Sequence, residues 1–113
     1  MRLINQTKNS ILADEVVVAD NFFTRLNGLL GKKHLQKGKA LIIRPCNAVH
    51  TFFMRFPIDV IFIDKDYKVI KIISCLKPFS FGGVCWKAIL VIEFPSGTLN
   101  SSNVGLGDSL QHF

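Results

Sequence analysis

The chain has 113 residues, of which 49% are hydrophobic and 19% are charged, and its formal net charge is +6. This composition supplies a hydrophobic core and excludes an intrinsically disordered chain, and the length is that of one domain, expected to span residues 1–113. Polar or charged residues interrupt every apolar stretch before it could cross a bilayer, and the N-terminus lacks the apolar region of a signal peptide. We therefore expect a cytoplasmic protein without a membrane span.

Short β-branched segments separated by polar turns dominate the chain and predict a mainly β fold. One stretch has a helical period instead, because Asp20 is a candidate N-cap, apolar residues follow at helical spacing, and Gly31 suits the left-handed position that ends a helix. The sequence therefore predicts one short α-helix over about residues 21–30. The expected strands are residues 2–6, 10–19, 40–44, 58–64, 69–75, 87–94 and about 109–112, and residues 50–54, if they are extended, would place His50, Phe52 and Met54 on one face.

Three connections are predicted from their turn-forming residues. Residues 65–68 form a tight turn, so strands 58–64 and 69–75 are expected to pair as an antiparallel hairpin. Residues 95–103 are expected to form a turn and a polar loop. Residues 76–86 contain proline and glycine and are expected to form a loop that either covers a pocket or folds down over the core. This loop carries three large aromatic residues, Phe79, Phe81 and Trp86.

The segment 50–64 is the most informative, because polar groups of mixed type lie within a strongly apolar run. Pro57 cannot donate to a sheet ladder, so it marks an edge, a strand start or a bulge. After it, both alternating sets of residues in strand 58–64 are largely apolar, which predicts a strand buried on both faces. Asp59 is the exception, and a buried carboxylate needs a partner. The nearest candidates in the sequence are His50, Arg55 and Arg44.

These side chains predict a polar node inside the β core, to which Glu93 also belongs because it interrupts an apolar strand in the same way. The node could bind a ligand, with an aromatic rim at its opening. The alternative is that each carboxylate belongs to a structural ion pair that fixes the strand register. The expected ligand-binding residues are His50, Thr51, Arg55, Asp59 and Glu93, with Phe81 and Trp86 at the pocket rim.

The cysteines, Cys46, Cys75 and Cys85, show no spacing that is typical of a zinc site. An odd number of cysteines favours reduced thiols in a cytoplasmic protein, and a Cys75–Cys85 disulfide is the alternative. We predict neither a metal site nor a cofactor.

The positive charge is unevenly distributed, because seven bases and no acid lie between Arg25 and Arg55. Such a cluster is either a solvated face or a surface that attracts phosphates or anionic lipid. The bases are Arg25, Lys32, Lys33, Lys37, Lys39, Arg44 and Arg55.

Several segments between about Ala19 and Asp108 together resemble a conserved prokaryotic family, domain of unknown function family 192. The resemblance implies a compact β-barrel or jelly-roll-like sandwich with a short helix. The activity of that family is not established, so the resemblance implies no catalytic residue. The segments that carry it are 28–31, 40–43, 52–64, 68–70, Pro78, 90–98 and 107–108.

Three functions are compatible with the sequence, and the first is favoured. It is a small non-enzymatic ligand-binding or accessory β module, in which polar groups on apolar walls orient a small molecule or a protein partner. The second is a small enzyme that uses His50 and Asp59, either with Cys46 as a thiol nucleophile or with Asp108 around a metal. The third is an adaptor or nucleic-acid binder that uses the basic segment 25–55, whose binding would fall steeply with salt.

Overall fold

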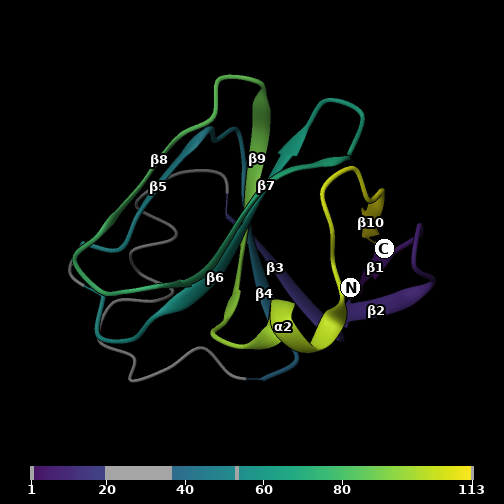
Figure 1. Cartoon of the computed structure of the whole chain (residues 1–113), viewed down its shortest axis with the longest axis horizontal. Helices are drawn as coiled ribbons and strands as arrows, with labels where there is room; N and C mark the ends of the chain where they lie inside the picture. Colours follow the sequence, from purple (N-terminus) through teal and green to yellow (C-terminus); the bar gives the residue numbers. More distant parts are fainter. Residues whose placement is uncertain (1, 20–36, 53, 113) are drawn as a thin grey trace.

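The structure is a computed structural model that describes residues 2–19, 37–52 and 54–112. It contains three β-sheets, which are stacked in layers (Figure 1). The central sheet has five strands, of which the first two in spatial order are parallel and the others antiparallel. In that order they are β3 (Glu15–Ala19), β4 (Lys39–Ile43), β9 (Ala88–Pro95), β6 (Ile58–Asp64) and β7 (Val69–Leu76).

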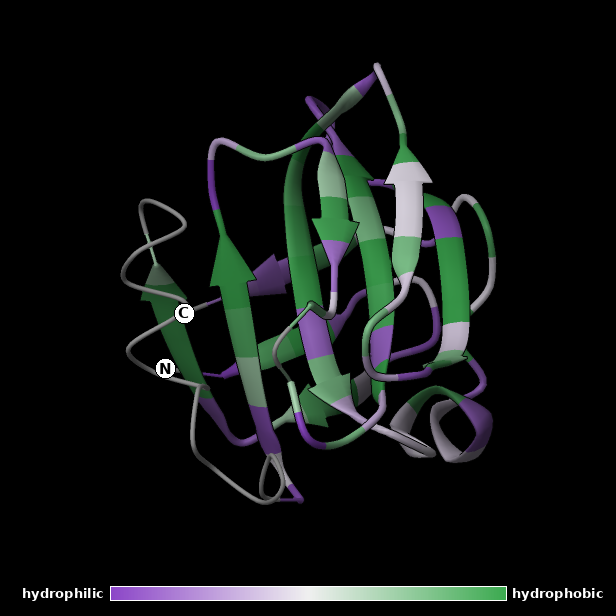
Figure 2. Cartoon of the chain, turned by 90° about the vertical axis from the view of Figure 1, so that its left-hand side faces the viewer, coloured by the Kyte–Doolittle hydropathy of each residue, from purple (hydrophilic) through white to green (hydrophobic). Residues whose placement is uncertain are grey.

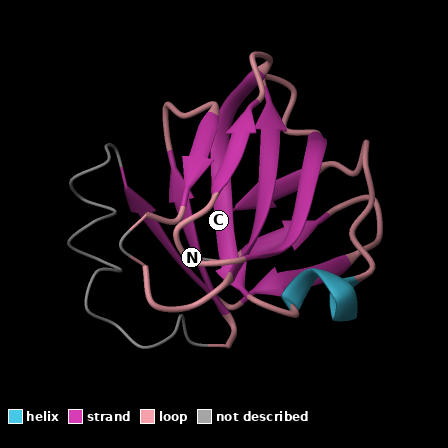
Figure 3. Ribbon diagram, turned by 60° about the vertical axis from the view of Figure 1, so that its left-hand side comes forward, coloured by secondary structure: helices cyan, strands magenta, loops and turns pink. Residues whose placement is uncertain are grey.

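Two smaller sheets cover the two faces of the central sheet (Figures 1 and 3). A three-stranded sheet, which brings the two ends of the chain together, has the order β10 (Leu110–His112), β1 (Leu3–Asn5) and β2 (Ser10–Ala13). The other sheet pairs β5 (Ala48–His50) with β8 (Phe81–Val84), and a short helix, α2 (Thr98–Ser102), follows β9. The mainly β prediction is thus confirmed, whereas the described strands form separate sheets that do not close into a barrel.

The central sheet is buried on both faces, as the apolar character of residues 58–64 predicts. Ile61 and Ile63 of β6 pack in one cluster with residues of the three-stranded sheet, whereas Val60 and Phe62 pack in a second cluster with Val49 of β5. Figure 2 shows hydrophobic residues along most of these strands and hydrophilic ones mainly in the connections. Two separate hydrophobic cores therefore hold the three sheets together.

The predicted hairpin of β6 and β7 is confirmed. Its turn is closed by the Asp64 carboxylate, whose Oδ1 accepts hydrogen bonds from the backbone N–H groups of Asp66 at 2.9 Å and Lys68 at 3.0 Å. Tyr67 takes a left-handed conformation in this turn, with φ 59°. Pro57 precedes β6 directly and so marks a strand start, one of the three positions allowed for it.

The expected strand 10–19 is in fact two strands that belong to different sheets. The chain passes from β2 in the three-stranded sheet to β3 in the central sheet at Asp14, whose backbone N–H donates to the Gly38 carbonyl at 2.8 Å. Leu12 and Val16 nevertheless join the same hydrophobic cluster. The crossing at Asp14 is hard to recognise in the sequence, because the residues on both sides of it bury side chains in one core.

The extended conformation considered for residues 50–54 is not found. β5 ends at His50, and the Met54 N–H donates to the Thr51 carbonyl at 3.1 Å, which closes a turn. As a result Met54 is buried and Phe52 is exposed, although an extended chain would put both on one face.

Two stretches that read as loops contain regular structure. Residues 76–86 include β8, and residues 95–103 include α2. The helix predicted over residues 21–30 lies outside the described residues. Among the described residues, no helix has the length and apolar character needed to cross a membrane. None of the three cysteines forms a disulfide.

Candidate functional site

Asp59 is 1% exposed, and its carboxylate is held entirely by backbone N–H groups. Oδ1 accepts a hydrogen bond from Cys75 at 2.8 Å, and Oδ2 accepts from Gly97 and Leu99 at 3.0 Å each. The predicted buried carboxylate is confirmed, but its predicted partners are wrong, because Arg44 and Arg55 are exposed and Asp59 forms no ion pair with any described residue.

Through these hydrogen bonds Asp59, which lies in β6 and far from α2 in the sequence, caps the start of that helix. α2 begins after Gly97, which has φ 95° and supplies no side-chain cap of its own. The first N–H groups of a helix lack partners within the helix, and a carboxylate satisfies them well. Asp59 therefore fixes the turn between β9 and α2 against the central sheet.

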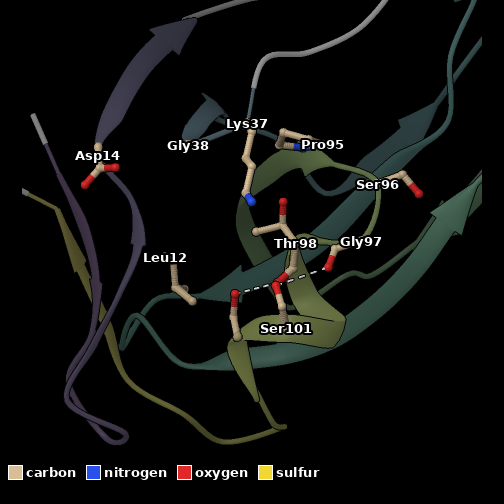
Figure 4. A pocket seen from close by; sticks show the side chains of 10 residues that line it. Leu12, Asp14, Lys37, Gly38, Pro95, Ser96, Gly97, Thr98 and Ser101 are labelled. Carbon is tan, nitrogen blue, oxygen red and sulfur yellow. Dashed lines mark hydrogen bonds between the residues drawn. The ribbon is translucent and has the colours of Figure 1, made fainter.

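A cleft of about 830 Å³ lies beside that turn (Figure 4). Three segments far apart in the sequence form its walls: the β2–β3 connection, the residues before β4, and the stretch from the end of β9 through α2. The residues that line it are Leu12, Asp14, Lys37, Gly38, Pro95, Ser96, Gly97, Thr98, Ser101 and Ser102.

The register of the central sheet brings these segments to one end. β3 and β4 run parallel with Glu15 opposite Lys39, so Asp14 and Lys37 lie just before the starts of neighbouring strands. β9 runs antiparallel to β4 and β6, so Pro95 at its end reaches the same edge. The cleft is thus a product of the sheet topology, and none of its three segments would form it alone.

The lining combines hydroxyl groups with one acid and one base. Ser101 Oγ donates to the Thr98 carbonyl at 3.1 Å and Ser102 Oγ donates to the same carbonyl, which leaves the hydroxyl oxygens as acceptors. The hydroxyl groups of Ser96 and Thr98 make no hydrogen bond with the described residues. Figure 4 shows the side chains of Lys37 and Thr98 directed into one opening. The cleft therefore offers donors and acceptors to a polar ligand.

A family model described as Uncharacterized ACR, DUF192, matches residues 3–112. The chain belongs to the DUF192 family. The resemblance seen in the sequence is confirmed by this match, and it covers both the Asp59 strand and the turn that Asp59 holds.

Relatives of this DUF192 protein occur in archaea. A UPF0127 protein of Pyrococcus horikoshii is 33% identical over 116 residues, covering 98% of each chain. A UPF0127 protein of Thermococcus sibiricus is 32% identical and covers 96% of this chain and 72% of its own. These relatives bear the name of a family of uncharacterised proteins and assign no activity.

Two solved structures have the same fold. A Sinorhizobium meliloti protein, provisionally called a transcription regulator, superposes with a TM-score of 0.77 at 21% identity over 97% of this chain and 89% of its own. A Novosphingobium aromaticivorans protein of unknown function has a TM-score of 0.76 at 17% identity over 98% and 82%. At these sequence identities, the two structures show that the fold is shared and carry no information about function.

The structure does not bring the predicted polar node together. Glu93 is fully buried beside Val60, which belongs to the cluster under β5 and β8. Asp59 alternates with Val60 along β6 and so points to the opposite face, toward the cluster under the three-stranded sheet. The two carboxylates of this DUF192 protein are therefore separated by the central sheet.

The remaining predicted site residues lie in the layer formed around β5 and β8. Thr51 is buried, and its hydroxyl group accepts a hydrogen bond from the Ser80 N–H at 2.9 Å. His50 Nδ1 accepts from the Phe52 N–H at 3.2 Å, and the two rings stack with centroids 4.8 Å apart. Arg55 is exposed. Phe81 and Trp86 are exposed as well, so they do not fold down over the core.

The enzyme arrangement considered in the sequence is not assembled. Cys46 and His50 lie in or beside β5, on the side of the central sheet away from Asp59. The carboxylate of Asp59 is already occupied by three N–H groups and cannot orient the imidazole ring. The described residues also contain no group of three side chains that could hold a metal ion.

Asp108 has a structural role that the sequence did not reveal, since it was considered only in a metal set. It is 5% exposed and accepts hydrogen bonds from Asn5 Nδ2 at 2.9 Å, the Gly105 N–H at 2.9 Å and Lys8 Nζ at 3.0 Å. Burial acts to raise the pKa of Asp108, but these hydrogen bonds and the Lys8 charge outweigh it, and the pKa lies below its usual value. Asp108 thereby ties β1 to the loop before β10.

The pH dependence of unfolding should report this role. A carboxyl group whose pKa is lowered in the folded state stabilises the fold above its unfolded pKa and loses that effect as the pH falls through its folded pKa. Asp108→Asn should cost about 1–3 kcal/mol at pH 7 and much less at pH 2. Urea unfolding of both proteins from pH 7 to pH 2 tests this, and a constant difference across that range would contradict it.

Proposed function

We propose that this protein is a small, non-enzymatic ligand-binding module and that its cleft binds an uncharged small molecule rich in hydroxyl groups. The observation that carries the proposal is the construction of the cleft. Its outer wall, the turn of Ser96 and Gly97, is anchored to the core by the buried carboxylate of Asp59. A wall held in this way needs little ordering when a ligand binds, which favours affinity.

The size and lining of the cleft support a small polar ligand. Its volume of about 830 Å³ falls within the range of small-molecule sites. Asp14 and Lys37 contribute one charge of each sign, so the cleft has no net attraction for an anion or a cation. The hydroxyl groups of Ser96 and Thr98 can each donate or accept a hydrogen bond, as the hydroxyl groups of a sugar or polyol do, and the hydroxyl oxygen of Ser101 can accept one.

A thermal-shift screen of the full chain tests the proposal. The probes are neutral sugars and polyols, with sugar phosphates, nucleotides, divalent metals and short nucleic acids as competing classes. A ligand at 100 times its dissociation constant adds about 2.7 kcal/mol of stability, which is easily detected. We expect a neutral polyhydroxylated compound to raise the melting temperature of the wild type, and Lys37→Ala and Asp14→Ala each to remove most of that rise.

Lys65→Ala is the matched control, because Lys65 is an exposed base in the β6–β7 turn at the other end of the central sheet. This variant should keep the full ligand response. A shift that persists in Lys37→Ala and Asp14→Ala but disappears in His50→Ala would move the site to β5 and overturn the assignment. Absence of any shift with neutral hydroxylated compounds would overturn the proposed ligand class.

A further inference from the structure

The layer around β5 and β8, residues 44–52, 54–57 and 77–89, carries most of the exposed large apolar side chains among the described residues. Trp86 is 84% exposed, Phe79 67% and Phe81 62%. A soluble surface rarely displays several large aromatic side chains together without a partner. The further exposed apolar residues in this layer are Phe52, Val84 and Ile89.

Backbone pairing makes these two segments one continuous surface. His50 pairs with Phe81 and Ala48 with Val84 in the small sheet, and the pairing extends beyond both of its ends. The Phe79 N–H donates to the Thr51 carbonyl at 2.9 Å, and the Cys46 N–H donates to the Ile89 carbonyl at 3.0 Å. β5 and β8 lie on one side of the molecule, away from the two chain ends (Figure 1).

The exposed Phe79 lies in a turn with an unusual backbone conformation. Phe79 has φ 57°, a left-handed conformation that is unfavourable for a bulky side chain. Thr51 fixes that turn, because its backbone carbonyl binds the Phe79 N–H and its hydroxyl group binds the Ser80 N–H. Residues in such conformations cluster at binding and functional sites, which supports a use for the exposed Phe79 side chain.

The charge of the layer has a single sign. Residues 44–57 and 77–89 contain no acid, although the whole chain has eight. Their four bases are all exposed, and two of them flank the aromatic residues in the sequence. The bases are Arg44, Arg55, Lys77 and Lys87. A surface of this charge attracts a partner that bears negative charge.

We infer that this layer docks on the surface of an anionic lipid bilayer. Trp and Phe side chains insert at the boundary between headgroups and acyl chains, and neighbouring Lys and Arg side chains bind anionic headgroups. A bilayer matches both properties across one plane, including the aliphatic side chains of Val84 and Ile89. The cleft is lined by no residue of this layer, so the docked protein would leave it open to the aqueous phase.

Vesicle binding of the full chain tests this inference, with Trp86 as the reporter because it is the only tryptophan in the chain. The wild type should sediment with vesicles that contain phosphatidylglycerol and should be released at high salt. Its emission should shift to shorter wavelength as Trp86 leaves water. Vesicles of pure phosphatidylcholine have no net negative charge and should bind about tenfold more weakly, a difference of about 1.4 kcal/mol.

Matched variants separate this surface from general stickiness. Phe79→Ser/Phe81→Ser should weaken partitioning at least about tenfold, and Lys77→Glu/Lys87→Glu should abolish the preference for phosphatidylglycerol. Leu106→Ser and Lys65→Glu are the controls, because both residues are exposed outside the layer. All four proteins should keep the wild-type melting temperature, since the replaced side chains are exposed.

Three results would overturn the inference. The first is no partitioning of the wild type onto phosphatidylglycerol vesicles. The second is an equal loss in Leu106→Ser and in Phe79→Ser/Phe81→Ser. The third is salt-sensitive binding of single-stranded DNA, with quenched Trp86 emission and no vesicle binding, which would assign the layer to nucleic acid.

Discussion

Asp59→Ala is expected to lower the free energy of unfolding by about 3 kcal/mol or more, the largest effect among exchanges of single polar side chains. The variant removes the acceptor of three backbone N–H groups, two of which start α2. The Leu99 N–H would then be buried without a partner, and a small cavity would remain in the core. Urea unfolding at pH 7 measures the change.

The conservative variant gives a sharper test of the same contact. An amide at position 59 offers one oxygen, which can accept from Gly97 and Leu99, but its nitrogen then faces the Cys75 N–H donor. Asp59→Asn should therefore cost about 1–3 kcal/mol, less than Asp59→Ala.

Asp66→Ala is the control, because Asp66 is an exposed carboxylate in the β6–β7 turn, and it should change stability by less than about 0.5 kcal/mol. If Asp59→Ala were as mild as this control, the carboxylate would not be what holds α2. Because Gly97 lines the cleft, Asp59→Asn should also weaken any ligand that binds there.

The environment of Asp59 in the structure shows what the sequence could and could not predict. A lone acid in an apolar strand predicts a buried carboxylate, because its neighbours force it inside. Its partners could not be predicted, because backbone N–H groups exist at almost every residue and leave no pattern in the sequence. For the same reason the search for a charged partner led to Arg44 and Arg55, which are exposed.

The elements that were predicted are those whose stability is local. β6 and β7 are rich in apolar residues and the turn between them is closed by the Asp64 side chain, so the signals for this hairpin all lie within residues 58–76. α2 was missed because its cap comes from a strand some 40 residues away. β8 was missed because two of its four residues are glycine, which is usually a sign of a loop.

The cleft was missed because its lining residues are ordinary ones. Asp14, Lys37 and Thr98 acquire meaning only when the parallel pairing of β3 with β4 brings their segments to one end of the sheet. The predicted polar residues, in contrast, stood out because they interrupt apolar strands. Asp59, one such interruption, is a structural position that holds a wall of the proposed binding cleft without lining it.

Gly82→Ala is expected to destabilise the protein by about 1–3 kcal/mol, and Gly82→Val by more, because the space beneath β8 is already filled. A Cβ atom at this position would lie 2.5 Å from Cγ1 of Val49, 3.1 Å from Cδ1 of Ile73 and 3.2 Å from Cδ2 of Leu76. Val49 is buried and cannot turn outward, so β8 would have to lift from the central sheet.

Gly105→Ala is the matched control, because a Cβ there would meet Lys8 Nζ at an ordinary 3.6 Å. Thermal unfolding of the two alanine variants should differ by several degrees, since about 1 kcal/mol shifts the melting temperature by roughly 4–8 °C in a small domain. Equal melting temperatures would mean that β8 does not pack against Val49. Because β8 is part of the layer that carries the exposed aromatic residues, Gly82→Ala should also weaken vesicle binding, although every exposed side chain of that layer is retained. Unchanged vesicle binding would mean that these side chains bind the bilayer without needing the native position of β8.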